Sequence, residues 1–223
     1  MPLLFFILGL AIGSFLNVLI DRLPRREKIT GRSYCEFCKK TLSWKDLIPV
    51  LSFVYLRGKC RYCKAKLSYQ YPFVELLTGI MFAFTYLYLN KSISNFQFPI
   101  SNFSPDPVYS LLSTLYYLIV VSSLIVIFFS DLKYGIIPDK IIFPSVVISI
   151  FYLLFSVNLS SISNHLLSAL GAFLFFLFIY LITKGRGMGF GDVKLAFLIG
   201  LVLGFPGTVL GLYIAFLTGG FIG

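Results

Sequence analysis

Charged residues are scarce in this sequence: they make up 13% of the 223 residues, and only nine are acidic. Soluble domains contain about a quarter charged residues, so this composition excludes an ordinary soluble protein and is typical of a membrane protein. The single histidine, His165, falls at the expected outer end of a helix and is not predicted to bind a ligand. The sequence also contains no internal repeat.

Hydrophobic residues make up 58% of the chain and gather in long runs. A membrane-spanning helix needs about 20 largely apolar residues, and seven runs qualify if the last two, short and rich in glycine, are tilted or closely packed. These runs are 3–20, 71–89, 109–129, 141–157, 166–183, 195–205 (extended back to Asp192) and 207–223. We therefore predict an all-α polytopic membrane protein with about seven transmembrane helices. The last run ends without a polar flank, so a shortened C-terminus is also expected, and one more helix could be missing there.

Basic residues are distributed unequally between the predicted loops. Of 19 lysine and arginine residues, 13 lie between Arg22 and Lys66, whereas the loop after the second helix holds only Lys91. Because cytoplasmic loops are enriched in lysine and arginine, we predict a multi-pass protein of the inner membrane with its N-terminus outside. The N-terminus also lacks the early positive charge of a signal peptide. The net charge is +10, and we predict that the basic residues beside the helices contact anionic lipid rather than nucleic acid.

All four cysteines lie in the predicted cytoplasmic segment 21–70, as two Cys-x-x-Cys pairs separated by 21 residues. They are Cys35, Cys38, Cys60 and Cys63. This spacing is typical of a four-thiolate zinc ribbon, and zinc would supply the folding energy that so small a module lacks. Since no coordination position stays open, the zinc is predicted to be structural. Two disulfides or a redox pair are the alternatives, and a reducing cytoplasm disfavours them.

The chain thus divides into a first transmembrane helix (1–20), the zinc module (21–70) and a helical membrane core (71–223), which contains two notable aspartates. Asp131 follows the third apolar run, and Asp192 ends a Gly-x-Gly-Asp string that precedes another. Ionisable residues at membrane depth are costly and usually functional. Two carboxyls that share a proton can act as acid and base on a peptide bond.

The two residues therefore predict an aspartic protease pair, provided that they meet. Other roles for these acids stay open. Asp192 could only cap its helix, Asp131 could only face interfacial water, and Asp139 could be the true partner although it is better explained as a helix cap.

Several motifs resemble those of the type IV prepilin leader peptidase family. They are Gly13-Ser14-Phe15-Leu16-Asn17-Val18 with Arg22-Leu23-Pro24, the two cysteine pairs, residues 71–79, Asp131 with Pro138-Asp139, residues 189–194, and Pro206-Gly207-Thr208. The resemblance runs from residue 13 to the end of the chain. Asn17, in the first motif, is predicted to form an interhelical hydrogen bond, and a role in substrate binding stays open for it.

The resemblance implies a membrane aspartyl endopeptidase that acts on type IV prepilins or pseudopilins. It would remove their basic leader after a glycine at the cytoplasmic face, with Asp131 and Asp192 as the catalytic pair. It also implies N-methylation of the new terminus with S-adenosylmethionine. Glu75 and Gly79 lie in the family motif associated with that step, and a helix-packing role is the alternative for both. Which pilin is the substrate, and the oligomeric state, stay open.

Two other functions fit parts of the pattern. A related Gly-x-Gly-Asp protease could act on archaeal preflagellins or other membrane segments, although the cysteine module and the opening motif disfavour this. A membrane scaffold or transporter with a zinc ribbon could instead use the aspartates to bind ions and would cleave nothing.

Overall fold

A computed structural model describes residues 1–90, 107–156 and 159–222 of the chain. Within these residues every regular element is a helix, apart from two isolated bridges in the cysteine segment. The predicted all-helical fold is therefore confirmed for the described residues. The chain separates into two compact units, one with the described residues 1–90 and 117–136, the other with 107–116, 137–156 and 159–222.

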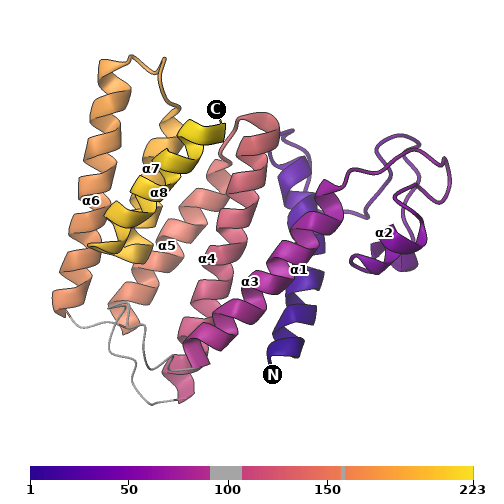
Figure 1. The fold of residues 1–223 in the computed structure, drawn as a ribbon, viewed down its shortest axis with the longest axis horizontal. Coiled ribbons are helices and arrows are strands. Elements are labelled where there is room, and N and C mark those ends of the chain that lie inside the picture. The colour runs from indigo at the N-terminus through magenta and orange to yellow at the C-terminus, as the bar shows by residue number, and fades with distance from the viewer. Residues whose placement is uncertain (91–106, 157–158, 223) are drawn as a thin grey trace. The chain divides into compact units, whose positions relative to one another are not determined.

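The first unit is built on two long helices that lie side by side (Figure 1). Its elements are α1 (Pro2–Arg22), η1 (Trp44–Leu47), α2 (Leu51–Tyr55), α3 (Gln70–Asn90) and the C-terminal part of α4 (Pro107–Tyr134). A Cβ atom added at Gly9 would lie 2.7 Å from the Cα of Gly79, so glycine is needed for α1 and α3 to approach this closely. Asn17 Nδ2 donates a hydrogen bond to the carbonyl oxygen of Tyr71 at 3.1 Å. The interhelical hydrogen bond predicted for Asn17 is thus confirmed.

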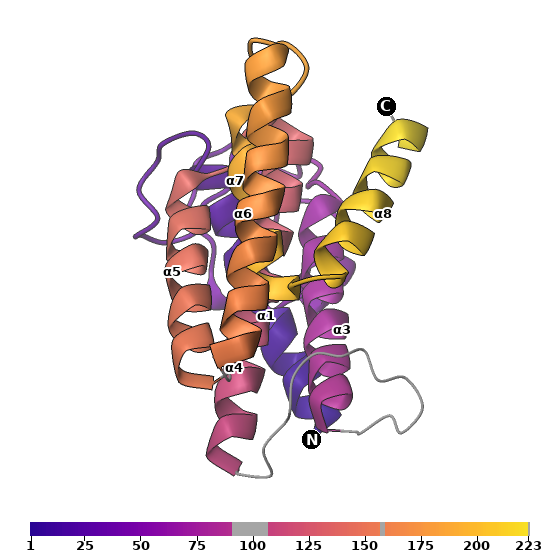
Figure 2. The same ribbon diagram turned by 90° about the vertical axis from the view of Figure 1, so that its left-hand side faces the viewer.

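The second unit contains the N-terminal part of α4 together with four further helices. These are α5 (Asp139–Ser156), α6 (Leu159–Ile182), α7 (Phe190–Leu203) and α8 (Gly207–Ile222). Helix α7 packs against α5 and α6, and Figure 2 shows α8 inclined away from α6. His165 and the backbone carbonyl of Leu201 form a hydrogen bond of 2.9 Å, which fastens the end of α7 to α6.

Helices α6 and α7 contact each other through Gly200, where an added Cβ atom would lie 2.7 Å from the backbone nitrogen of Ala169. We expect Gly200→Ala to reduce the free energy of unfolding by about 1–3 kcal/mol because the two backbones must separate. Gly171→Ala is the matched control, since an added Cβ there meets no atom within 4 Å. It should be neutral or stabilising by up to about 1 kcal/mol. Unfolding in detergent measures both variants, and equal effects would contradict this packing.

Four helices of the described residues are long and apolar enough to cross a membrane. They are Pro2–Arg22, Gln70–Leu89, Leu111–Tyr134 and Ser161–Ile182. The chain is therefore a multi-pass membrane protein. All seven predicted segments contain a helix, but α7 has only 14 residues and is about 21 Å long, less than the roughly 30 Å hydrocarbon core. Lys91, the basic residue of the predicted outer loop, lies outside the described residues.

Candidate active site and metal centre

The two cysteine pairs form knuckles with matching backbone geometry. In each knuckle the amide of the first cysteine donates to the carbonyl five residues later, Lys40 at 3.0 Å and Ala65 at 2.9 Å. The residue after the second cysteine has a positive φ in both knuckles, 56° at Lys39 and 59° at Lys64. Because the two knuckles turn in the same way, the two sulfur atoms of each cysteine pair point to the same side of their knuckle.

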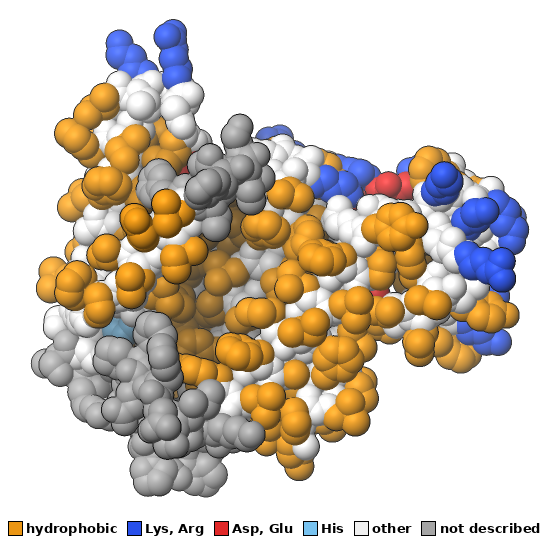
Figure 3. Space-filling model, viewed as in Figure 1, with side chains coloured by type: hydrophobic (Ala, Val, Ile, Leu, Met, Phe, Trp, Pro, Cys, Tyr) orange, Lys and Arg blue, Asp and Glu red, His pale blue; other side chains and the backbone are white. Residues whose placement is uncertain are grey.

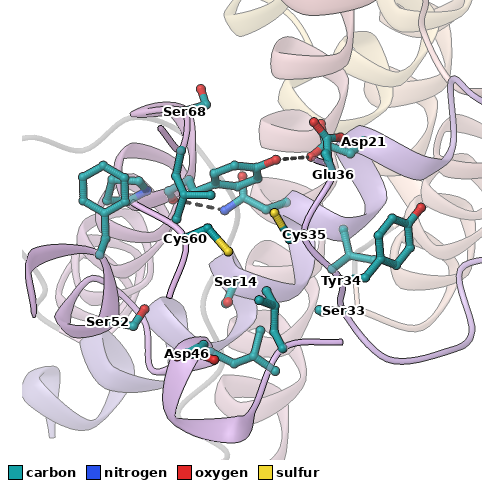
Figure 4. Close-up of a pocket in the computed structure, with 18 of the residues that line it drawn as sticks. Ser14, Asp21, Ser33, Tyr34, Cys35, Glu36, Asp46, Ser52, Cys60 and Ser68 are labelled. Atoms are coloured by element: carbon teal, nitrogen blue, oxygen red, sulfur yellow. Dashed lines mark hydrogen bonds between the residues drawn. The ribbon is translucent and has the colours of Figure 1, made fainter. Parts of the chain in front are cut away.

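The sulfur atoms of all four cysteines lie within 4.8 Å of one another. Cys35 Sγ and Cys63 Sγ are 3.8 Å apart, and a tetrahedral zinc ion bound at 2.3 Å requires sulfur–sulfur distances of about 3.8 Å. Cys35 and Cys60 are buried, and Figure 4 shows their sulfur atoms close together. The geometry and chemistry of these four ligands therefore fit zinc.

The thiols differ in how readily they ionise. Burial raises the pKa of Cys60, but hydrogen bonds from the backbone amides of Cys63 and Tyr62 and from neighbouring thiols outweigh it and lower this pKa to about 7. At Cys63 a backbone hydrogen bond with Ala65 lowers the pKa, but burial and the neighbouring thiols raise it to about 11. Since zinc binds thiolates, Cys60 is more readily available as a ligand near neutral pH than Cys63.

A buried carboxylate at the end of α1 connects three helices of the first unit. Asp21 accepts hydrogen bonds from the hydroxyl of Tyr71 at 2.9 Å, from Lys133 Nζ at 2.5 Å and from the hydroxyl of Tyr134 at 3.3 Å. Tyr71 lies at the start of α3, whereas Lys133 and Tyr134 end α4, two and three residues after Asp131. This Asp21 network therefore holds the turn that carries Asp131 against α1 and α3.

Asp21→Asn removes the charge that pairs with Lys133, and we expect the free energy of unfolding to fall by about 2–3 kcal/mol. The pair is only partly exposed, at 29% for the Lys133 side chain and 13% for Asp21. Glu36→Gln is the matched control, because it breaks an ion pair with Arg25 in which the side chains of Arg25 and Glu36 are 38% and 40% exposed. It should lower the free energy of unfolding by less than about 1 kcal/mol. Thermal unfolding in detergent compares them. Equal losses would contradict a structural role of the Asp21 network.

Glu75 lies in the second turn of α3 and is buried. Its Oε2 accepts a hydrogen bond of 2.7 Å from the amide of Val50, which has a φ of 59°, an uncommon value for a β-branched residue. Glu75 thus fastens the cysteine segment to α3. Gly79 packs against α1, since an added Cβ would lie 3.0 Å from the ring of Phe6. The contacts of Glu75 and Gly79 fit a role in helix packing, which was the alternative to methyl-donor binding for both residues. These contacts do not test whether either residue binds a methyl donor.

A cavity of about 510 Å³ lies between α1, α3 and the cysteine segment (Figure 4). Glu75, Asn17 and Asp21 line it, together with apolar side chains such as Phe53 and Leu56. Asn17 is 4% exposed, and its Oδ1 has no hydrogen-bond partner. The cavity therefore combines the carboxylates of Glu75 and Asp21 with apolar side chains.

The two predicted catalytic aspartates lie at helix ends. Asp131 is exposed in the last turn of α4. Asp192 is half-buried at the third position of α7, and its Oδ2 accepts the amide of Gly189 at 3.1 Å. Asp192 is therefore not the N-cap residue that the alternative predicted: Gly189 is the N-cap, and Asp192 accepts its amide from the third helical position. Asp131 belongs to the first unit and Asp192 to the second, and their proximity stays a prediction.

Asp139, the other candidate partner, is the first residue of α5. Its carboxylate pairs with Lys194 Nζ at 2.6 Å. The pair connects the first residue of α5 to the second turn of α7, at a lysine two residues after Asp192. A lysine in an ion pair thus follows each predicted catalytic aspartate by two positions, Lys133 after Asp131 and Lys194 after Asp192.

Comparison with known proteins separates the chain into two matching parts. Residues 7–89 match the bacterial peptidase A24 N-terminal domain, and residues 118–223 match the type IV leader peptidase family. A prepilin leader peptidase/N-methyltransferase of Bacillus subtilis is 35% identical over 206 residues, which cover 89% of this chain and 72% of the relative. The chain belongs to the type IV leader peptidase family.

Other relatives of this leader peptidase carry the same name. The protein of Vibrio cholerae is 32% identical over 91% of this chain and 77% of its own length. That of Klebsiella pneumoniae is 29% identical over 92% and 87%. No solved structure gave a significant match. The predicted family is confirmed, and the chain is an enzyme of a protease family.

Both groups of candidate residues fall inside the matching parts. The N-terminal match contains the four cysteines, Glu75 and Gly79, and the leader peptidase match contains Asp131 and Asp192. The protease and methyltransferase activities named for the relatives therefore have candidate residues in different parts of this chain.

Proposed function

We propose that this leader peptidase is an aspartyl endopeptidase that removes the basic leader of type IV prepilins or pseudopilins after a glycine at the cytoplasmic membrane face. The observation that carries the proposal is the combination of relatives named prepilin leader peptidase/N-methyltransferase with Asp131 and Asp192 at helix ends inside the peptidase match.

In the proposed mechanism the two carboxyls share one proton and activate a water molecule. Asp192 accepts a backbone amide at the N-terminal end of α7, where the helix dipole stabilises negative charge. We therefore assign Asp192 as the base that takes the proton from water. Asp131 would donate its proton to the carbonyl oxygen of the scissile peptide as the water oxygen bonds to the carbonyl carbon. Asp192 would then pass the proton taken from water to the leaving nitrogen as the carbon–nitrogen bond breaks, and Asp131 would regain its proton as the carbonyl re-forms.

The membrane arrangement is part of the proposal. We propose that seven helices cross the inner membrane with the N-terminus outside, so that the zinc module 21–70 lies in the cytoplasm between the helix 1–20 and the peptidase core 71–223. The unequal distribution of basic residues supports this orientation. Zinc would be held by Cys35, Cys38, Cys60 and Cys63 as a structural ion, because four thiolates leave no open position.

We further propose that the protein N-methylates the new terminus and that the cavity beside Glu75 holds S-adenosylmethionine, which supplies the methyl group. The positive sulfonium group suits a cavity lined by the carboxylates of Glu75 and Asp21. Gly79 contributes to this site through the α1–α3 packing that places Glu75.

A cleavage assay tests the proposal. Purified protein in detergent is mixed with a prepilin that carries a basic leader, and mass spectrometry identifies the product terminus with and without S-adenosylmethionine. We expect leader removal after the glycine in both reactions and a mass increase of one methyl group with the donor only. An intact prepilin would contradict the protease assignment, and a product without added mass would contradict the methylation.

A further inference from the structure

The short helices of the cysteine segment expose apolar side chains on one side. In η1 and the residue after it, Trp44, Leu47 and Ile48 are 70%, 40% and 37% exposed. They are spaced i, i+3 and i+4, so Trp44 and Leu47 share a face of the 3₁₀ turn. The pattern of exposed apolar residues is repeated in α2.

Helix α2 is apolar on two faces. Leu51, Val54 and Tyr55 are 68%, 67% and 78% exposed and, at i, i+3 and i+4, form one face. Phe53 and Leu56 are half-buried and line the cavity instead. A helix that is apolar all round is normally covered on every side, so the outer face lacks a partner within the described part of the chain. We call Trp44, Leu47, Ile48, Leu51, Val54 and Tyr55 together the outer apolar face.

The depth of α2 relative to α3 is fixed by a hydrogen bond. Val50, directly before α2, donates to Glu75, which lies five residues after the start of α3 at Gln70. Helix α3 from Gln70 to Leu89 is long and apolar enough to span a membrane, and five residues correspond to about 7 Å along it. Figure 1 likewise shows α2 at the height of the middle of α1 and not beyond the end of α1 at Arg22. A membrane span that begins at Gln70 would therefore place the outer apolar face at the level of the membrane.

Basic side chains accompany the outer apolar face. Lys45, Arg57 and Lys59 are exposed within or next to η1 and α2, and Figure 3 shows the lysine and arginine side chains of the first unit gathered on the cysteine segment. Tryptophan and tyrosine favour the headgroup level of a membrane, and lysine and arginine favour anionic headgroups. Exposed apolar side chains at membrane depth, with lysine and arginine beside them, fit a lipid surface better than a protein partner.

We propose that the outer apolar face inserts into the headgroup and acyl boundary of the leaflet at which α1 ends, with anionic lipid bound by the neighbouring basic residues. The cysteine segment is then an interfacial module that lies in the membrane surface. This inference does not depend on leader cleavage, because it uses only the geometry of the first unit.

Tryptophan fluorescence tests the inference, because Trp44 is the only tryptophan in the chain. Zinc-loaded full-length protein is placed in vesicles of phosphatidylcholine and phosphatidylglycerol, with or without bromine on the upper acyl carbons. Since an interfacial helix lies about 5–10 Å deep, we expect a blue-shifted emission that brominated lipid quenches by about half or more and that water-soluble acrylamide barely quenches.

Two charged variants separate insertion from a general effect. The double variant Leu51→Glu, Val54→Glu should restore acrylamide quenching and reduce bromolipid quenching while one zinc per chain is retained. Phe37→Glu is the control: Phe37 is 69% exposed but lies in the first knuckle, outside the outer apolar face, and this variant should behave as wild type. Emission quenched by acrylamide and not by brominated lipid would overturn the inference. Protection of Trp44 from acrylamide that appears only with added prepilin would also overturn it, because the substrate would then cover the face. Protection that appears only as the protein-to-lipid ratio rises would do the same, because a second copy of the chain would then cover it.

Discussion

Replacing either Asp131 or Asp192 with asparagine is expected to abolish leader cleavage, with rates lower by about 10³-fold or more. Asparagine keeps the size of the side chain but can neither share the proton nor accept one from water. Because both acids act in the same step, the addition of water to the peptide carbonyl, the double variant should be no slower than the slower single variant. Initial rates of leader removal, followed by mass spectrometry at saturating prepilin, measure the effect.

Asp139→Asn is the control for this prediction. It makes the same chemical change at another aspartate of the core and removes only the ion pair with Lys194. We expect it to retain cleavage within about tenfold of wild type, since a partly exposed ion pair contributes little. If Asp139→Asn is inactive while Asp131→Asn still cleaves, the catalytic partner of Asp192 is Asp139 and the assignment of Asp131 is wrong.

Loss of zinc is expected to unfold the cysteine segment and leave the membrane helices in place. Four converging sulfur atoms hold the two knuckles together, and the binding free energy of such a structural ion is about 10–16 kcal/mol. We expect about one zinc per chain by elemental analysis and its loss in Cys60→Ser, which removes one of the four sulfur ligands. Proteolysis should then cut between residues 21 and 70, while circular dichroism still reports the long helices.

Tyr62→Phe is the matched control in the same knuckle, because Tyr62 contributes its backbone amide and no metal ligand. It should retain zinc and resist the protease like wild type. Disulfides, the alternative for these cysteines, predict the reverse sensitivity: a segment that survives chelation and opens with reductant. That result would contradict the zinc site.

The long helices could be predicted because hydropathy is a local property of sequence. Each predicted apolar run contains a helix of the described residues, and only the boundaries moved. Helix α4 extends to Tyr134, beyond the predicted end at 129, so Asp131 lies within the helix and not after it. The family could also be predicted, since its motifs lie in contiguous stretches. The cluster of four cysteines could be predicted for the same reason, because two Cys-x-x-Cys pairs indicate it by their spacing.

The parts that escaped prediction depend on contacts between distant residues. Asp21 and Lys133 are 112 positions apart, and composition counts their charges without showing that they pair. The sequence does show that a lysine follows each of Asp131 and Asp192 by two positions. It does not show which acidic residue pairs with either lysine. Helix α2 was missed because five residues are too few for a hydrophobic period. The bond from Val50 to Glu75, and not local propensity, fixes the position of this helix.

The proximity of Asp131 and Asp192 is the central claim, since two carboxyls that share a proton lie about 3 Å apart. Chemical crosslinking with a short thiol-reactive reagent tests it in protein with cysteines at positions 131 and 192, with and without bound prepilin. Cysteines at 139 and 194, which replace a pair in contact, give the positive control. We predict a 131–192 crosslink by peptide mapping. Its absence in both states, while the 139–194 pair reacts, would contradict the shared-proton mechanism.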